Sequence, residues 1–459
     1  MSLFVSHYIN QNTSMGQAMP LSIKEYLKRG PSTSKEIQAV TGLSQSSVAR
    51  RLRELGDNIV QIQDGRSIRY AATCNAFGVN DKIPLGLVDH LGKISVVAYL
   101  RPLSHGGYFL QPVTNISPLL LGESGNGLYD GLPYFLYDLR PQGFLGRQIS
   151  RKMATHLEEF SSDPRQWTNT HIGKYLISNG DDLPGNFILG EQSILRLARR
   201  PYGVTGKLYP KLAEDVLKGE VPGSSAGGEQ PKFTAFSSLY ESHVIVKFSP
   251  KDDTDIAKRW RDILITEYHA AQIINENICP AAQTRFLEAE GRLFLETHRF
   301  DRLGVFGRYS MISLQAIDDE FTGLGHNWVR VMGALKDQGL VRDQDAHVAG
   351  QLLYFGQLIH NTDMHLGNLS LFIDGEMFKL LPCYDMCSMG FAPKSVGEVG
   401  PFFFDASEIP DPELNKNDIT HLRRLAYAFW ENVLGDEHIS SEFRAFLSRG
   451  NPVASLLVD

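Results

Sequence analysis

Hydrophobic residues near the beginning of the chain follow first a helical and then a strand-like pattern. Residues 20–56 contain three short runs with apolar positions at helical spacing, and Gly30-Pro31 ends the first of them. Residues 59–72 then alternate between apolar and polar residues on both sides of Asp64-Gly65, a dipeptide typical of hairpin turns. Three short helices followed by a hairpin is the order of a winged helix-turn-helix domain, which we predict for residues 1–75.

Two of these predicted helices begin with residue types that accept hydrogen bonds from the first helical turn. Thr33 stands three residues before Glu36, which is the pattern of a capping box. Ser44 precedes the third run, in which Val48 and Leu52 share one face. That face is expected to be buried, so the polar and basic residues of the same run are left to solvent.

The remainder of the chain predicts a larger α+β body. Residues 85–205 alternate short apolar strands with turns rich in glycine and proline, which is typical of a mixed α/β region. Farther along, the pattern predicts a glycine loop between two strands, a buried strand, an amphipathic helix and another strand, at residues 221–236, 241–250, 261–275 and 291–302. Residues 328–459 are predicted to be mostly helical, with polar interruptions near 360–369 and 379–389.

Composition sets outer limits on the kind of protein. The chain has 459 residues with 42% hydrophobic and 21% charged residues, which predicts a globular protein of about two to four domains. Only four cysteines occur, none in a CxxC pair, so we expect free thiols in a reducing compartment. No signal-peptide pattern and no membrane-spanning run is evident, which favours a cytoplasmic location.

The net charge of −7 argues against a general polycation but allows a local basic patch. Residues 20–70 contain nine Lys/Arg and five Asp/Glu, a surplus of four positive charges. The predicted third helix and hairpin carry the polar and basic residues that could contact DNA: Ser46, Ser47, Arg50, Arg51, Arg53, Arg66 and Arg69. DNA binding is therefore one interpretation. The alternative is a solvated face in a small packing or dimerising module.

A glycine loop, a strand lysine and a helix glutamate follow one another in the central part of the chain. The loop SSAGGEQPK (224–232) would let backbone N–H groups approach phosphates, although a simple hairpin turn would also account for it. Lys247 ends a buried apolar strand, where an unpaired charge is costly. Glu267, on the following helix, is a suitable partner, and protein kinases hold ATP phosphates with such a pair.

The stretch HNTDMHLGNL (360–369) concentrates polar residues between two apolar runs. Asn368 lies five residues after Asp363, and Asp385 follows seventeen residues after Asn368 at the end of another apolar run. Phosphoryl transfer needs a carboxylate near the acceptor hydroxyl and oxygen ligands for Mg²⁺, which this order supplies. A metal site built from His360, Asp363 and His365 competes for the same residues, as does a purely structural polar turn.

Together these segments resemble the HipA family of bacterial serine/threonine kinases, the toxins of HipBA-type toxin–antitoxin systems. The matching segments are SAGGEQPK, VIVKFS, HRFDR, NTDMHLGNLSLF and YDMCS, with GLPYFLYDLRPQGFLGR and GDDLPG in the preceding region. The resemblance covers roughly residues 85–440. The additional N-terminal winged helix is similar to the HipH (YjjJ) branch of that family.

The resemblance implies roles for individual residues. Asp363 takes the catalytic position, Asn368 and Asp385 the Mg²⁺ positions, and Ser225 that of an autophosphorylated loop serine. The ATP-binding positions correspond to Gly227, Gly228, Glu229, Gln230, Pro231, Lys232, Lys247, His298, Arg299, Phe300, His365, Leu366, Gly367, Asn368 and Asp385. ATP and Mg²⁺ are the implied cofactors, and aminoacyl-tRNA synthetases are among the substrates known for the family.

We therefore predict a two-lobed, protein-kinase-like α+β fold preceded by a winged helix-turn-helix domain. The expected divisions are a HipA-type N-terminal subdomain, a kinase N-lobe and a helical C-lobe, at residues 85–205, 206–320 and 321–459. The expected function is an ATP- and Mg²⁺-dependent serine/threonine protein kinase of the toxin type that also binds DNA. A small-molecule phosphotransferase, or a DNA-acting regulator or nuclease with a kinase-like body, remains an alternative.

Overall fold

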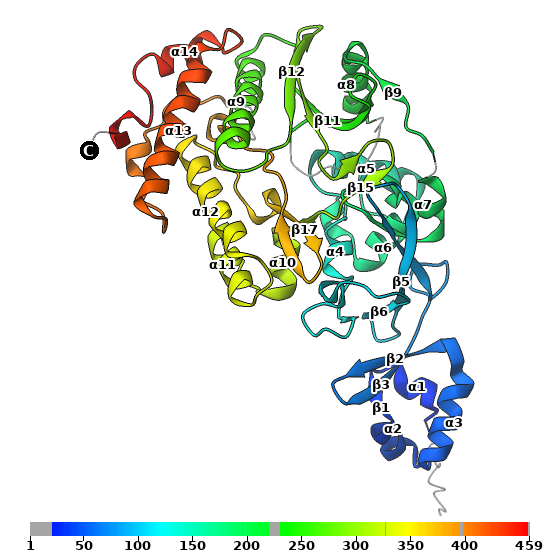
Figure 1. The fold of residues 1–459 in the computed structure, drawn as a ribbon. Coiled ribbons are helices and arrows are strands. Elements are labelled where there is room, and N and C mark those ends of the chain that lie inside the picture. The colour runs from blue at the N-terminus through cyan, green and yellow to red at the C-terminus, as the bar shows by residue number, and fades with distance from the viewer. Residues whose placement is uncertain (1–20, 198, 220–229, 326, 394–397, 458–459) are drawn as a thin grey trace, which may run out of the picture. The chain divides into compact units, whose positions relative to one another are not determined.

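The computed structural model describes residues 21–197, 199–219, 230–325, 327–393 and 398–457, which form two compact units (Figure 1). The first extends to Cys74 and also includes Leu103–His105, because Ser104 N donates to Ala72 O at 2.8 Å and Leu103 pairs with Thr73. The second consists of the rest of the chain.

The first unit contains short helices and a three-stranded antiparallel sheet of order β1-β3-β2. Its elements are α1 (Ile23–Leu27), β1 (Ser32–Thr33), α2 (Ser34–Thr41), α3 (Gln45–Leu55), β2 (Ile59–Asp64) and β3 (Ser67–Ala72). Ile37, Val48 and Leu52 join its small apolar core. The expected order of three helices and a hairpin is therefore present.

Local hydrogen bonds explain where these helices begin. Both hydrogen bonds of the Thr33–Glu36 capping box form, and Ser44 accepts from the backbone of the first turn of α3, so both predicted caps are confirmed. The hairpin is also confirmed, but its loop is displaced by one residue. Asp64 pairs with Ser67 inside the ladder, and Gly65 takes the positive φ of 57° at the first loop position, which glycine adopts without strain.

A five-stranded sheet of order β7-β6-β5-β4-β8 opens the second unit. Its strands are β4 (Ile83–Val88), β5 (Ile94–Pro102), β6 (Tyr108–Pro112), β7 (Leu128–Tyr129) and β8 (Phe187–Leu189). The helices of this region are α4 (Tyr134–Tyr137), α5 (Gly143–His156), α6 (Asn169–Asn179) and α7 (Glu191–Arg196). Apolar residues of the sheet and of α4 and α6 form one continuous core with the C-terminal helices.

A second five-stranded sheet, of order β12-β13-β11-β10-β9, carries the predicted strand lysine. It consists of β9 (Gly203–Val204), β10 (Lys232–Ser237), β11 (Ser242–Phe248), β12 (Thr284–Ala289) and β13 (Arg292–His298). Two helices accompany it, α8 (Tyr209–Leu217) and α9 (Asp255–Asn277), the latter confirming the predicted amphipathic helix. Antiparallel pairing places Lys232 of β10 directly opposite Lys247 of β11.

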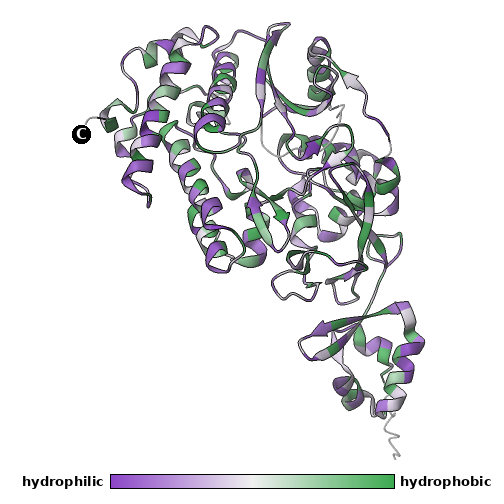
Figure 2. Ribbon diagram, in the orientation of Figure 1, coloured by the Kyte–Doolittle hydropathy of each residue, from purple (hydrophilic) through white to green (hydrophobic). Residues whose placement is uncertain are grey.

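The C-terminal part is mostly helical, as expected. Its helices are α10 (Leu314–Phe321), α11 (Trp328–Asp337), α12 (Asp343–Leu358), α13 (Lys416–Gly435) and α14 (Ser441–Leu447). Helix α13 carries both hydrophobic and hydrophilic residues in Figure 2 and buries one side, with Leu422, Phe429 and Val433 in the core. Helix α12 is instead polar at its start and buried along its second half.

Short strands complete the C-terminal part. They are β14 (Arg302–Leu303), β15 (Gly307–Arg308), β16 (Ile312–Ser313), β17 (Ser370–Asp374) and β18 (Met377–Leu380). The stretch at 360–369 connects α12 to β17. The predicted α+β class is therefore confirmed. Within the described ranges, the helices are too short or too polar to cross a membrane.

Candidate active site

A buried lysine joins three elements of the second unit. The side chain of Lys247, 6% exposed, donates to both carboxylate oxygens of Glu267 at 2.6 Å and to Asp385 Oδ1 at 2.7 Å. The lysine comes from β11, the glutamate from the middle of α9, and the aspartate from the segment after β18. The predicted Lys247–Glu267 pair is therefore confirmed, and Asp385 shares the same ammonium.

The charges of Lys247, Glu267 and Asp385 shift one another's pKa. Although burial alone would lower the pKa of Lys247, the carboxylates of Asp385 and Glu267 raise it above its usual value. Burial opposes ionisation of Asp385 as well, yet the Lys247 ammonium and, to a smaller extent, Lys232 hold its pKa below the usual range. Burial and the nearby Asp385 raise the pKa of Glu267. An additional negative charge here would need further cations.

A second buried cation lies at the start of β10. Lys232 is only 2% exposed and is the cross-strand neighbour of Lys247, so both side chains leave the sheet on the same face. Gln230, 6% exposed, has a buried side-chain amide nitrogen with no hydrogen-bond partner among the described residues. A buried donor without a partner is uncommon and is consistent with a ligand oxygen at this place.

The stretch after α12 is a loop held by its own polar side chains. Asn361, which is buried, accepts from Asp363 N at 3.0 Å through its side-chain oxygen. Asn368 donates from Nδ2 to Asp363 O at 2.5 Å. The backbone N–H of Asp363 is thus bonded by one asparagine side chain and its carbonyl by the other. The Asp363 carboxylate itself remains 50% exposed. A carboxylate that is exposed on a fixed backbone can accept a proton from an incoming hydroxyl.

Neighbouring elements also bond to the second half of this loop. Trp328 donates from Nε1 to His365 O at 2.9 Å, and Tyr384 donates from its hydroxyl to Gly367 O at 3.1 Å. In α12, a Cβ added at Gly356 would lie 2.3 Å from Met364 Sδ and 2.9 Å from Met386 Sδ. The absence of a side chain at Gly356 therefore lets the 360–369 loop and the Asp385 segment rest on the same helix.

Asn368 and Asp385 provide oxygen donors of the kind that Mg²⁺ prefers. Asp385 uses Oδ1 for Lys247, whereas its Oδ2, like the side-chain oxygen of Asn368, bonds to no described residue. Asp385 also has a positive φ of 55°, which is uncommon for a residue with a side chain and is often found at functional sites. The donor set therefore fits a Mg²⁺ ion that takes its other ligands from phosphates and water.

Three expected ATP-binding residues, His298, Arg299 and Phe300, lie at or directly after the end of β13 and differ in how their side chains are placed. Arg299 is buried and bonds to Asp301 at 3.0 and 2.9 Å and to Asp182 at 3.2 Å. Its guanidinium thus stabilises the protein interior, so contact with a nucleotide would use its backbone. Phe300 is partly exposed, and its ring lies 5.5 Å from that of Tyr384, while His298 is partly exposed at the strand end.

The histidine-metal interpretation has little geometric support. The ring of His360 stacks on Phe404 with centroids 4.3 Å apart, and a Cβ at Gly390 would lie 2.2 Å from its Nε2. Burial lowers the pKa of His360, as expected for a ring among aromatic residues. His365 accepts from Gly367 N through Nδ1 and has its Nε2 3.8 Å from Asp363 Oδ1. Within the described ranges, no cluster of three His, Cys, Asp or Glu could hold a metal ion.

Comparisons with known proteins bear on the same regions. Residues 79–198 match the family described as YjjJ-like toxin, middle domain, and residues 224–432 match the HipA-like C-terminal domain. The toxin YjjJ of Escherichia coli K12 is 36% identical over 435 residues, covering 92% of this chain and 94% of that protein. The chain belongs to the YjjJ-like family of HipA-related toxins.

A solved structure supports the fold. A chain of the complex of HipA, HipB and operator DNA from Shewanella oneidensis MR-1 is similar with a TM-score of 0.54 and 15% identity. The similarity covers 82% of this chain and 96% of that chain. The predicted HipA-like fold is thus confirmed.

Several expected ATP-binding residues lie outside the described residues, namely Gly227, Gly228 and Glu229, as does the expected autophosphorylation site Ser225. Pro231 is described and accepts from Phe248 N at 3.2 Å. Leu366 is 4% exposed and belongs to the apolar core, so any ligand contact at this position would come from its backbone. The structure thus brings together Lys232, Lys247 and Asp385, with Asp363 and Asn368 on the adjoining loop.

The residues expected to contact DNA differ in the exposure of their side chains and in whether those side chains already have hydrogen-bond partners. Ser46, Arg50, Arg51, Arg53 and Arg66 are exposed, and Ser47 is half-buried beside the Ser44 hydroxyl. Arg69 is more constrained, because it bonds to Asp64 at 2.7 Å across the hairpin and to Pro31 O at 3.4 Å. Arg51 and Arg66 form no hydrogen bond or ion pair with any residue in the described part of the chain, which leaves both available to a ligand.

Sequence reasoning missed three residues of the site. Asn361 positions Asp363, Tyr384 holds the loop at Gly367, and Asp182 bonds to both Arg299 and Arg302 at 3.2 Å. A polar Asn361 directly after an apolar helix was a possible signal, as was a tyrosine next to Asp385. The matching segment GDDLPG contains Asp182 and was the signal here, although its contact with Arg299 joins residues 117 positions apart.

Proposed function

We propose that the protein is an ATP- and Mg²⁺-dependent serine/threonine protein kinase that acts as a HipA-like toxin. The observation that carries this proposal is the buried Lys247 ammonium shared by Glu267 and Asp385, with a second buried lysine beside it. This arrangement suits triphosphate oxygens and a metal ion between the proposed N-lobe (206–320) and C-lobe (321–459). Family membership and fold agree with the proposal.

Each residue has a separate task in the proposed reaction. Mg²⁺-bound ATP supplies the γ-phosphoryl group. Lys247 and Lys232 neutralise phosphate charge, and Asp385 and Asn368 are the proposed Mg²⁺ ligands. Asp363 orients the acceptor hydroxyl and accepts its proton, which its exposed carboxylate permits.

Transfer of label from ATP tests the proposal. The wild-type protein with Mg²⁺ is expected to label itself, at Ser225, or a bacterial protein such as an aminoacyl-tRNA synthetase. Asp363→Asn should reduce transfer by about 10²- to 10⁴-fold, as removal of a general base does. Asp374→Asn is a matched control, because Asp374 is also about half exposed but lies in the β17–β18 hairpin.

Three results would contradict the kinase proposal. They are equal labelling by the Asp363→Asn and Asp374→Asn variants, no labelling of any protein by the wild type, and transfer only to small hydroxylated metabolites. The last result would favour the phosphotransferase alternative. Mass spectrometry of phosphopeptides from cells expressing wild type or Asp363→Asn identifies the acceptor residues.

We further propose that the first unit is a winged helix-turn-helix domain that binds DNA. Arg51 on α3 and Arg66 on the hairpin, which are exposed and bond to no described residue, support this, as does the sheet order β1-β3-β2. The similar HipA chain comes from a complex that contains its operator DNA. In this chain, the proposed DNA contacts belong to the toxin itself.

Fluorescence anisotropy with labelled DNA fragments from the protein's own promoter tests this second proposal. Arg51→Glu/Arg66→Glu should weaken binding and reduce the dependence of log Kd on log salt by about 0.9 for each phosphate that the variant no longer neutralises. Lys416→Glu/Arg424→Glu, exposed residues of α13, changes the net charge equally and should bind as the wild type does. Equal affinities for both variants would contradict DNA binding through α3 and the hairpin.

A further inference from the structure

Three arginines and two aspartates form a buried charge cluster between the β14–β15 hairpin and the segment before β8. Arg299, Arg302 and Arg308 are 7%, 7% and 8% exposed, and Asp301 is 3% exposed. Asp301 accepts from Arg299 at 2.9 Å and from Arg302 at 2.5 Å. Asp182 accepts from the same two arginines at 3.2 Å each. These five residues, the arginine cluster, carry three positive and two negative charges.

Arg308 is the member of this cluster that has no carboxylate partner among the described residues. Its Nη2 donates to the backbone carbonyl of Asp181 at 2.5 Å, whereas the Asp181 carboxylate pairs with Arg196 at 2.8 Å. Arg308 lies directly opposite Arg302 in the hairpin ladder, so both side chains leave the same face. Like charges in such a pair repel one another. The arginine cluster therefore has a surplus of one positive charge.

Titration of the groups in this region does not remove the surplus. Burial and repulsion from Arg302 lower the pKa of Arg308 to about 9, which leaves the side chain charged at neutral pH. Although burial opposes ionisation, Arg299 and Arg302 hold the pKa of both carboxylates of the cluster below the usual range. Burial, together with Arg299 and Arg302, lowers the pKa of the neighbouring His243 to about 4, so this ring is neutral and adds no charge.

Two N–H groups of the arginine cluster have no hydrogen-bond partner among the described residues. They are Nε of Arg302 and Nη1 of Arg308, and both atoms are buried. A buried donor without an acceptor is uncommon and indicates a ligand or an ordered water. Here both donors belong to the cross-strand pair that contains the surplus charge. An anion satisfies the donors and the charge together, whereas a water molecule satisfies the donors alone.

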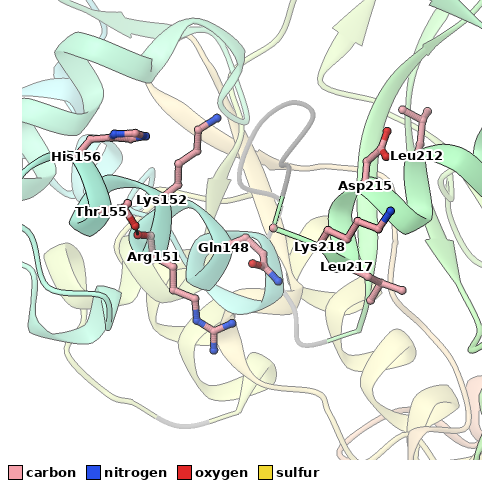
Figure 3. Close-up of a pocket in the computed structure, with 10 residues that line it drawn as sticks. Gln148, Arg151, Lys152, Thr155, His156, Leu212, Asp215, Leu217 and Lys218 are labelled. Atoms are coloured by element: carbon pink, nitrogen blue, oxygen red, sulfur yellow. Dashed lines mark hydrogen bonds between the residues drawn. The ribbon is translucent and has the colours of Figure 1, made fainter.

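The groove between α5 and α8 lacks this arrangement, although it also contains cations. Figure 3 shows Arg151 and Lys152 of α5 and Lys218 beyond α8 pointing in different directions. The described lining of that groove ends at Gly219, the residue before 220–229. Exposed cations that diverge are screened by water and salt and need no common ligand. The buried charge of the arginine cluster is screened much less.

We propose that the arginine cluster binds one small monovalent anion, such as chloride, through Arg302 Nε and Arg308 Nη1. One negative charge matches the surplus of one, whereas a phosphate or sulfate dianion would reverse the sign of the cluster. The bound ion neutralises the joint between the hairpin and the segment before β8. This site is independent of the proposed kinase function, because it uses none of the residues assigned to phosphoryl transfer.

Urea unfolding of the full chain tests the proposal, with sodium gluconate replaced stepwise by sodium chloride at a constant ionic strength of about 0.15 M. Gluconate is too large to enter a buried site between two side chains. An ion that binds the folded protein alone lowers the unfolding equilibrium constant, by about tenfold when its concentration is about ten times its Kd. The wild type should show this saturating decrease. A constant that does not change with chloride overturns the proposal and leaves both N–H groups to water.

Two variants show whether such a decrease originates at the arginine cluster. Arg308→Gln removes the surplus charge and keeps an amide that can donate to Asp181 O, so the chloride dependence should be lost. Arg342→Gln is the control, because Arg342 is 57% exposed, lies 3.8 Å from Asp374 and should leave the wild-type dependence unchanged. Equal chloride dependence of the wild type and Arg308→Gln refutes binding at this cluster.

Bromide, which resembles chloride and scatters anomalously, locates the ion in crystals of the full chain. The wild type should show an anomalous peak beside Arg302 Nε and Arg308 Nη1, and Arg308→Gln should show none there. The wild-type map also decides the matter if Arg308→Gln fails to fold. A map without a peak at the arginine cluster overturns the proposal, and peaks confined to exposed side chains identify an adventitious ion only.

Discussion

Replacement of Lys247 by methionine tests the charge cluster independently of catalysis. Methionine has a similar length but no ammonium, so Glu267 and Asp385 would lose the cation that bonds to both at 2.6 and 2.7 Å. Removal of one partner from a buried ion pair typically costs about 3–5 kcal/mol, because the other charge is left buried and unpaired. With side-chain exposures of 6% for Lys247 and 4% for Glu267, Lys247→Met should lower the free energy of unfolding by about 3–5 kcal/mol.

Urea unfolding followed by circular dichroism measures this loss. Lys251→Met is the control, because Lys251 is 57% exposed, pairs with Glu290 at 3.6 Å and should cost at most about 1 kcal/mol. The pKa of Asp385 is lowered in the wild type, so its contribution to stability is present above the unfolded value of about 3.9 and is lost as the pH falls through the folded value. The difference between wild type and Lys247→Met should therefore be largest near neutral pH and should shrink in acid. Equal unfolding free energies for the two variants would refute the reasoning.

Three further predictions follow from single contacts. Gly356→Ala places a methyl group against two methionine sulfurs and should cost about 1–3 kcal/mol, whereas Gly333→Ala in α11, where a Cβ meets nothing within 4 Å, should be neutral or stabilising in the same urea assay. Burial raises the pKa of Asp262 to about 6, so its contribution to stability is present in acid and is lost as the pH rises through about 6. The urea midpoint of Asp262→Asn relative to wild type should accordingly increase between about pH 4 and pH 7, and a constant difference would contradict the assignment. Asn361→Ala releases the backbone of Asp363 and should lower kcat for phosphoryl transfer by about tenfold to a hundredfold with little change in the KM for ATP; an unchanged kcat would show that this hydrogen bond does not position the carboxylate.

Much of the local structure could be predicted because its causes are close together in the sequence. The capping box at Thr33 and the hairpin near Gly65 depend on residues two to four positions apart, and both formed. The amphipathic pattern of residues 261–275 correctly predicted a helix that carries Glu267 inward. Lys247 was recognisable because a charge at the end of an apolar strand requires a partner.

Other features depend on residues that the fold alone brings together. Asp385 and Lys247 are 138 positions apart, and no pattern of apolar and polar residues indicates that the ammonium of Lys247 bonds to two carboxylates. The resemblance placed Arg299 among the expected ATP-binding positions, but the burial of its side chain with Asp301 and Asp182 depends on residues that only the fold brings together.

Helix caps, turn residues and the spacing of apolar positions act over a few residues, so the helices, the strands and the candidate catalytic residue types of this protein can be predicted from its sequence. It also limited the candidate catalytic residues to a short polar loop and two later oxygen donors. Which charges are paired and which remain available is set by the packing of the whole fold. That outcome depends on burial and on distances of a few ångströms between remote segments, and these are set when the sheets and helices pack.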